Sequence, residues 1–235
     1  MTDIHCHLIY GIDDGSRSVE ESIEVLTDLY NYGYRNIILT PHYIKDSSYC
    51  NKANDNYKRM KVLQRIIDQN GLNMRLFLGN EIYMDDEIYE LLKSGEIYSL
   101  NGTEYLLIEL PMDGEYPDYK EVFKDLMNKG CKIVLAHPER YLAFQKDFNI
   151  IYDLEKIGVF FQSNIESLIG RYGEGAKVMI KRLLKEKKIA FLATDIHHKK
   201  HNYSDYDKAK SEALKYISES EYETLVKTNP SKLIC

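Results

Sequence analysis

The sequence predicts an α/β fold in which seven parallel strands close into a barrel with helices outside. Short apolar runs alternate with longer amphipathic stretches along the chain, the order expected of repeated βα units. Runs such as Asn36–Thr40 and Lys132–Ala136 are apolar on successive residues, as in parallel strands covered on both faces. No linker, low-complexity tract or repeat divides the 235 residues, so one domain is expected over 1–235.

The expected elements follow one another regularly. Strands are predicted at Asp3–His5, Asn36–Thr40, Arg75–Gly79, Tyr105–Leu110, Lys132–Ala136, Val159–Gln162 and Ile189–Thr194. Helices are predicted between Ser18 and Gly33, at Asp55–Asn70, Asp86–Lys93, Asp118–Asn128, Phe148–Lys156 and Ala176–Lys187, with two more between Asp205 and Val226. Ser18 and Glu21 have the spacing of a capping box, and Gly33 and Gly71 are placed to end helices.

This pattern implies either a barrel or a doubly wound sheet. The chain is slightly short for eight βα units, and seven strands are found, so a seven-stranded barrel fits better.

Composition and charge exclude several classes of protein. The net charge of −6 and pI near 5.7 argue against nucleic-acid binding. No apolar run approaches the roughly 18 residues of a membrane span, and the opening residues do not resemble a signal peptide, so no membrane insertion is expected. The four cysteines, Cys6, Cys50, Cys131 and Cys235, lie far apart, which is typical of isolated thiols in a reducing cytoplasm.

Potential metal ligands follow every predicted strand except the sixth. They are His5, His7, Asp14, His42, Glu81, Glu109, His137, Asp195 and His197. The carboxyl ends of barrel strands meet at one rim, so these side chains should converge there. His5 and His7 are two residues apart and should project from the same face of their strand, while Cys6 points away.

A single histidine is more often a structural residue than a ligand. Here, however, five of the seven histidines stand at strand ends, beside several carboxylates. Burying that many charges together is costly without cations, so a small metal cluster is the better interpretation. Mixed imidazole and carboxylate ligands suit Mn²⁺, Fe²⁺ or Zn²⁺ rather than Ca²⁺.

Arg140 is the basic residue beside this group, in the run His137-Pro-Glu-Arg140. Its planar guanidinium could hold two phosphate oxygens. The alternative is a salt bridge to Glu139 or to another neighbouring carboxylate.

Seven short motifs, in order along nearly the whole chain, resemble the polymerase and histidinol phosphatase (PHP) superfamily. They are Asp3-Ile-His-Cys-His7, Asp13-Asp-Gly15, Thr40-Pro-His42, Gly79-Asn-Glu81, Ile108-Glu109, Ala136-His-Pro-Glu-Arg140 and Thr194-Asp-Ile-His197. More closely, they are similar to the bacterial manganese-dependent protein-tyrosine phosphatases of the CpsB/YwqE type. This resemblance implies a distorted, TIM-like (β/α)7 barrel with three divalent metal ions, Mn²⁺ being expected and Fe, Zn, Co or Mg being alternatives.

The resemblance also implies how the ligands are shared. One metal would take His5, His7, Glu81 and Asp195; a second would take Glu109 and His137 and share Glu81; the third would take Asp14, His42 and His197. Arg140, Asp195 and His197 would be the catalytic residues. Relatives often carry a second arginine after the last histidine, where this chain has Lys199 and Lys200.

The implied reaction is hydrolysis of phosphotyrosine on a bacterial tyrosine kinase that controls capsule or exopolysaccharide synthesis. A hydroxide bridging two metals would attack phosphorus, and phosphate or a small anion should bind at the site. No cysteine is followed six positions later by arginine, so the cysteine-based phosphatase loop is absent. The alternatives are a small-molecule phosphatase of the histidinol-phosphate type and, from another class, a polymerase-type nuclease or scaffold module.

Overall fold

The structure is a computed structural model that describes residues 1–199 and 203–234. Its strands are β1 (Thr2–Asp3), β2 (Asn36–Leu39), β3 (His42–Tyr43), β4 (Arg75–Leu78), β5 (Glu81–Tyr83), β6 (Tyr105–Glu109), β7 (Lys132–Ala136), β8 (Phe160–Asn164) and β9 (Phe191–Ala193). Its α-helices are α1 (Val19–Tyr32), α2 (Ala53–Gln69), α3 (Ile88–Ser94), α4 (Tyr119–Asn128), α5 (Leu142–Lys146), α6 (Asn149–Ile157), α7 (Glu174–Lys185), α8 (Ser204–Ala213), α9 (Glu219–Glu223) and α10 (Asn229–Ser231). Short 3-10 turns lie at η1 (Leu100–Gly102), η2 (Pro138–Arg140) and η3 (Ile165–Ile169), and η4 (Thr224–Thr228) is a π-helical turn.

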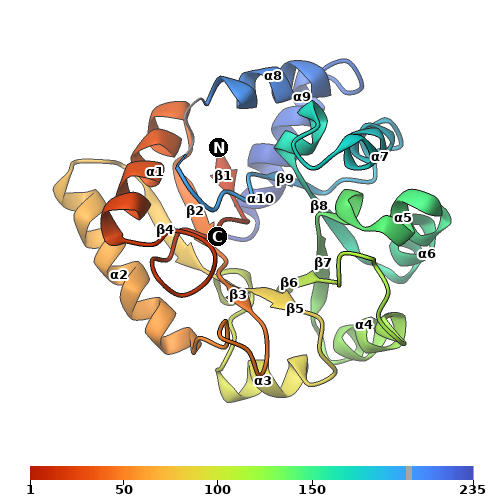
Figure 1. Ribbon diagram of the computed structural model, residues 1–235, viewed down its shortest axis with the longest axis horizontal. Helices are drawn as coiled ribbons and strands as arrows, with labels where there is room; N and C mark the ends of the chain where they lie inside the picture. The colour runs from red at the N-terminus through yellow and green to blue at the C-terminus, as the bar shows by residue number, and fades with distance from the viewer. Residues whose placement is uncertain (200–202, 235) are drawn as a thin grey trace.

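The strands form two parallel sheets in the middle of the molecule, and the helices surround them (Figure 1). One sheet has the order β1-β2-β4 and the other β3-β5-β6-β7-β8-β9. Every strand pair in the described part of the chain is parallel. The prediction of an α/β fold with a parallel sheet is therefore confirmed.

Two of the seven expected strands are each followed by a further short strand, which gives nine strands in the described residues. The run Asn36–Thr40 stops before Pro41, which has no backbone N–H for the ladder, and the chain resumes as β3. The run Arg75–Gly79 stops where Gly79 packs against Leu100, and β5 follows. The side chain of Asn80 donates to the Pro41 carbonyl oxygen at 3.1 Å and so connects the two breaks.

The helices lie close to the predicted ranges. The hydroxyl of Ser18 accepts from the Glu21 amide at 3.2 Å, but the Glu21 carboxylate accepts from the Arg17 amide, so only half of the expected capping box forms. Gly33 ends α1 with φ 112°, a left-handed conformation that favours glycine. The tail forms two helical stretches, as expected: α8, and α9 continuing without a gap through η4 into α10. Helix α5 was not expected.

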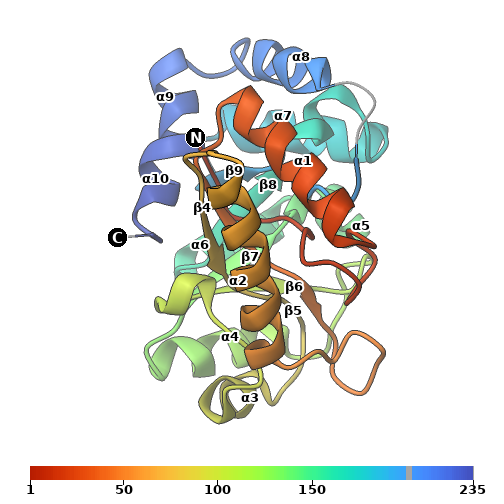
Figure 2. The same cartoon turned by 90° about the vertical axis from the view of Figure 1, so that its left-hand side faces the viewer.

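Two apolar clusters fill the fold. The larger one lies between the sheets and the helices, and the smaller one joins side chains from several strands with the C-terminal segment. The smaller cluster contains Ile4, Ile38, Leu107, Val134 and Leu233, each fully buried. Figure 2 shows both termini on the left-hand side of the molecule and the red and orange loops after β1 and β3 on the right-hand side. None of the described helices is long and apolar enough to cross a membrane.

Candidate metal centre

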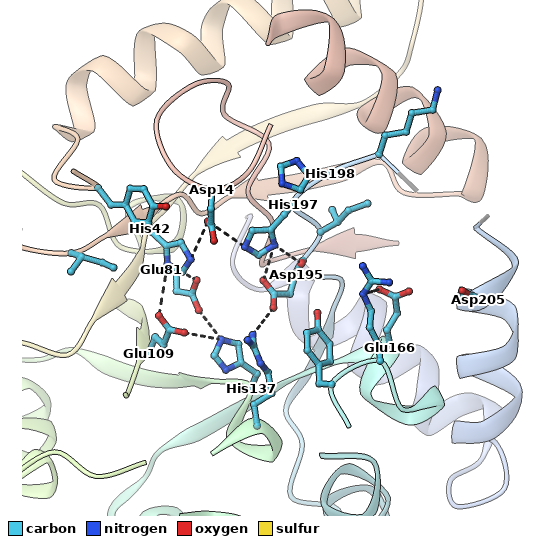
Figure 3. A pocket seen from close by; sticks show the side chains of 17 residues that line it. Asp14, His42, Glu81, Glu109, His137, Glu166, Asp195, His197, His198 and Asp205 are labelled. Atoms are coloured by element: carbon cyan, nitrogen blue, oxygen red, sulfur yellow. Dashed lines mark hydrogen bonds and ion pairs between the residues drawn. The ribbon is translucent and has the colours of Figure 1, made fainter. Parts of the chain in front are cut away.

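A pocket of about 670 Å³ opens where the parallel strands end, and seven of the nine predicted ligand residues line it (Figure 3). The other two, His5 and His7, are buried against Glu81 and Asp195 of that lining. The potential ligand atoms of all these residues fall into four overlapping groups, within each of which the atoms lie no more than 4.8 Å apart. Every one of the nine belongs to at least one group. The parallel strands thus bring together residues that are up to 192 positions apart in the sequence, from His5 to His197.

Glu81, at the start of β5, lies at the centre of the cluster and is 1% exposed. Its Oε2 atom lies 3.2 Å from Nε2 of His5, 3.2 Å from Nε2 of His7 and 3.0 Å from Nδ1 of His42. Its Oε1 atom lies 2.9 Å from Nε2 of His137. One carboxylate therefore faces four imidazoles, the arrangement expected of a residue shared between cations.

Asp195 and Glu109 flank this centre. Oδ1 of Asp195 lies 3.3 Å from Nε2 of His5 and 3.4 Å from Nε2 of His7. Oε1 of Glu109 lies 3.5 Å from Nε2 of His137. Asp195 also forms a group with His5 and His137, and Glu109 forms one with His42 and Glu81, so both carboxylates connect ligands from different strands.

Asp14 lies at the more open edge, with its side chain 51% exposed. Its Oδ1 atom lies 3.5 Å from Nε2 of His42 and 3.5 Å from Nε2 of His197. His42 also contacts Glu81, so the histidine belongs to two neighbouring groups. The division into three separate ligand sets therefore stays a prediction.

Three residues that orient these ligands were missed by the sequence analysis. Asp13 accepts from Nδ1 of His7 at 3.0 Å, and Gln162 accepts from Nδ1 of His5 at 2.8 Å. Asn164 donates to Oδ2 of Asp195 at 2.6 Å. When Nδ1 of His5 and of His7 carries the proton, the lone pair on Nε2 of each ring points to the centre of the ligand cluster. β8, which corresponds to the sixth predicted strand and is followed by no predicted ligand, thus supplies two orienting amides.

The pKa values in the cluster are shifted because its carboxylates and imidazoles are buried close to one another. Burial raises the pKa of Glu109, and the adjacent charge of Glu81 raises it further, to about 9. Burial, with the charge of Arg140, lowers the pKa of His137 to about 4. For Asp13, burial alone would raise the pKa, but the hydrogen bond to His7 and that imidazole's charge lower it to about 2.

The donor set fits divalent cations. Oε2 of Glu81 and Nδ1 of His42 are buried and, among the described residues, have no hydrogen-bond partner, although they lie 3.0 Å apart. Unpaired buried polar atoms are uncommon, and a cation between them would satisfy both. Nitrogen and oxygen donors in this mixture match first-row metals such as Mn, Fe and Zn.

Arg140, at the end of η2, extends into the pocket. Its Nη1 donates to Oδ2 of Asp195 at 3.1 Å, and its guanidinium lies 4.6 Å from the ring centre of Tyr172. The salt bridge weighed in the sequence analysis thus forms with Asp195, not Glu139, which accepts from the Asn164 amide at 2.8 Å. Because Arg140 remains 25% exposed, it can still reach an anion in the pocket.

The family model for CpsB/CapC, capsular polysaccharide synthesis, matches residues 1–235. The chain belongs to this CpsB/CapC family. Among its curated relatives, the tyrosine-protein phosphatase YwqE of Bacillus subtilis is 34% identical over 85% of this chain and 78% of its own length. The putative tyrosine-protein phosphatase CapC of Staphylococcus aureus is 31% identical over 84% of this chain and 77% of its own length.

A solved structure is similar to the whole CpsB/CapC chain. It comes from the crystal structures of YwqE from Bacillus subtilis and CpsB from Streptococcus pneumoniae, described as unique metal-dependent tyrosine phosphatases. The TM-score is 0.91 at 31% identity, covering 100% of this chain and 94% of the other. The resemblance stated from the sequence motifs is confirmed.

Two further basic side chains of this CpsB/CapC chain, Lys199 and Arg171, line the pocket. Lys199 lines the pocket, but its ammonium group pairs with Glu24 of α1, and Lys200 lies outside the described residues. Arg171, after η3, also lines the pocket and was not predicted. Its Nε lies 3.5 Å from Oε2 of Glu166, and its side chain is 55% exposed. No motif in the sequence marked Arg171, because only the turn after η3 brings it to the pocket.

Proposed function

We propose that this chain is a metal-dependent protein-tyrosine phosphatase that acts on a bacterial tyrosine kinase involved in capsule or exopolysaccharide synthesis. The observation that carries the proposal is the convergence of nine nitrogen- and oxygen-bearing side chains, with Glu81 at their centre, at the floor of an open pocket. The relatives named tyrosine-protein phosphatases, at 31% and 34% identity, support the same activity.

The centre would hold three divalent metal ions, with Mn²⁺ expected and Fe, Zn, Co or Mg as alternatives. The proposed ligands are His5, His7, Asp14, His42, Glu81, Glu109, His137, Asp195 and His197. When bound, such ions polarise phosphoryl oxygens and lower the pKa of water to near neutrality. The buried, unpaired oxygen of Glu81 supports its role as the shared ligand.

The chain's own groups would bind and orient the phosphoryl group. Arg140 would donate to its oxygens from the side of Asp195, with the guanidinium plane set by the ring of Tyr172. Asp195 and His197 complete the proposed catalytic set beside it, joined by a 2.9 Å contact from Nδ1 of His197 to the Asp195 carbonyl oxygen. A phenolate leaving group has a conjugate-acid pKa near 10, so it requires less protonation than an alkoxide.

We also propose that the two sheets form one domain, a distorted, TIM-like (β/α)7 barrel. Backbone hydrogen bonds continue past the strand breaks, from the Gly79 amide to the Leu39 carbonyl at 2.9 Å, and between the two sheets, from the Asp195 amide to the His5 carbonyl at 2.8 Å. Cys6 and Ile196 pair as a parallel bridge between the first and last strand regions. The smaller apolar cluster would then be the inside of this barrel.

A cytoplasmic location is proposed from the thiols. Cys6, Cys50 and Cys131 are free cysteines, as in proteins of a reducing compartment, and Cys235 lies outside the described residues.

The deciding experiment is a phosphatase assay on chelated protein before and after Mn²⁺ is restored. Phosphotyrosine peptide should be hydrolysed only by the restored protein, with metal content measured in parallel. A clear preference for histidinol phosphate would replace the proposal with a small-molecule phosphatase. Hydrolysis of single-stranded DNA but no phosphomonoester would favour the nuclease alternative, and no activity on any substrate would favour a scaffold.

A further inference from the structure

One wall of the pocket differs chemically from the rest. Ile44 and Tyr49, on the loop between β3 and α2, are half-buried and line the pocket. Most of the other lining side chains are carboxylates, imidazoles or cations. The ring of Tyr49 lies nearly parallel to that of His42, with centres 6.0 Å apart and 10° between planes. An apolar, aromatic surface therefore stands directly beside the proposed metal ligands.

Several contacts hold this wall in place. The Ile44 amide donates to the Tyr49 carbonyl oxygen at 3.4 Å, which closes the loop on itself. Nζ of Lys45 lies 2.9 Å from Oε2 of Glu87, next to α3. At its far end, the side chain of Asn51 donates to the Ile12 carbonyl oxygen at 2.6 Å. A wall fixed in this way loses little conformational entropy when it receives a ligand.

The depth of the pocket sets where a substrate's ring would lie. Glu81 and Glu109 at the floor are 1% and 6% exposed, whereas Ile44 and Tyr49 are half-buried at the rim. A phosphoryl group that reaches the floor leaves the rest of the side chain at the height of the rim. The other aromatic ring at the rim, Tyr172, already lies against Arg140, so Ile44 and Tyr49 offer the less occupied apolar surface.

We propose that Ile44 and Tyr49 form the subsite for the aromatic ring of the substrate and thereby select aryl over alkyl phosphomonoesters. This inference rests on the proposed function and names the residues that determine its substrate class. The ring would pack against Tyr49 and Ile44 while the phosphoryl group faces the carboxylate and imidazole floor. Ring packing of this kind typically changes affinity by about two- to tenfold.

The test compares phenylphosphonate with methylphosphonate, two phosphonates that are not hydrolysed. Their dissociation constants are measured by calorimetry on Mn²⁺-restored protein, for wild type, Tyr49→Ala, Ile44→Ala and Tyr49→Phe. Tyr57→Ala is the matched control, because Tyr57 is 44% exposed on α2 and does not line the pocket. Metal content is measured for each variant.

Wild type should prefer phenylphosphonate, and Tyr49→Ala should reduce that preference by about three- to tenfold. Tyr49→Phe and Tyr57→Ala should keep the wild-type preference, and methylphosphonate affinity should change less than twofold in every variant. An unchanged preference in both alanine variants would overturn the subsite, as would an equal loss for both phosphonates. Since these are binding measurements, they test the subsite even if wild type fails to hydrolyse phosphotyrosine, a failure that would count against the proposed function instead.

Discussion

The floor and the outer wall of the pocket are positioned in different ways. Floor residues such as His5, Glu81 and Asp195 stand at or just beyond strand ends and are fixed by backbone bonds between parallel strands. Wall residues such as Tyr49 and Arg171 stand on loops and are held by contacts within and between loops rather than by strand pairing. The floor therefore tolerates little change without loss of chemistry, while the wall can vary and set the choice of substrate.

The largest effect is expected from Glu81→Ala, at the centre of the floor. Removing the carboxylate that faces four imidazoles should lower kcat/KM by about a thousandfold or more, because several kcal/mol of charge stabilisation are lost. Metal content and phosphotyrosine turnover are measured together. The matched control is Glu90→Ala, an exposed residue of α3. Full activity in Glu81→Ala would contradict the role of Glu81 as the shared metal ligand.

Arg140→Ala should lower turnover by about a hundred- to a thousandfold, the usual effect of removing one hydrogen-bond donor that stabilises the transition state. The metals should stay bound, because Arg140 donates to Asp195 but offers no ligand atom. Arg140→Lys should recover only part of the rate, since an ammonium group lacks the planar fork. Loss of metal together with activity would show that Arg140 supports the floor rather than the substrate.

Asp13→Asn should weaken metal affinity by about ten- to a hundredfold, as other changes behind a metal-bound histidine do. The amide keeps the shape of Asp13 but accepts less strongly from Nδ1 of His7. Metal affinity is measured by competition with a chelator, and turnover is measured at saturating Mn²⁺. Unchanged metal affinity would mean that the hydrogen bond from His7 to Asp13 does not contribute to metal binding.

The smallest effect is expected from Arg171→Ala, on the wall. The side chain is 55% exposed, so its attraction for a phosphorylated peptide is screened by salt. KM should rise by about two- to fivefold at low salt and less at high salt, with kcat unchanged. A fall in kcat comparable to that of Arg140→Ala would place Arg171 in the floor's chemistry and weaken the contrast between the two regions.

The floor could be predicted from the sequence because the carboxyl ends of parallel strands meet at the same edge of the fold. Nine ligand residues were identified from their positions after apolar runs, and the structure brings all nine together. The orienting role of Gln162 could not be predicted in this way, because an uncharged amide at a strand end does not stand out as a potential metal ligand does. Arg171 and Tyr49 were missed because loop conformation depends on tertiary contacts rather than on periodicity. The short strands β3 and β5 were also missed, because neither His42–Tyr43 nor Glu81–Tyr83 is an apolar run long enough to predict a strand.

Because the first and last strand regions pair, the metal centre can form only after most of the chain has been synthesised. The side chain of Asp3 accepts from the amide and the hydroxyl of Thr194, 191 positions away, and the His7 amide donates to the Ile196 carbonyl at 2.9 Å. A chain still growing on the ribosome holds His5 and His7 but lacks Asp195 and His197 until most of it has emerged. A protein cut short before Asp195 would keep most of the ligands and lose the closure that aligns them.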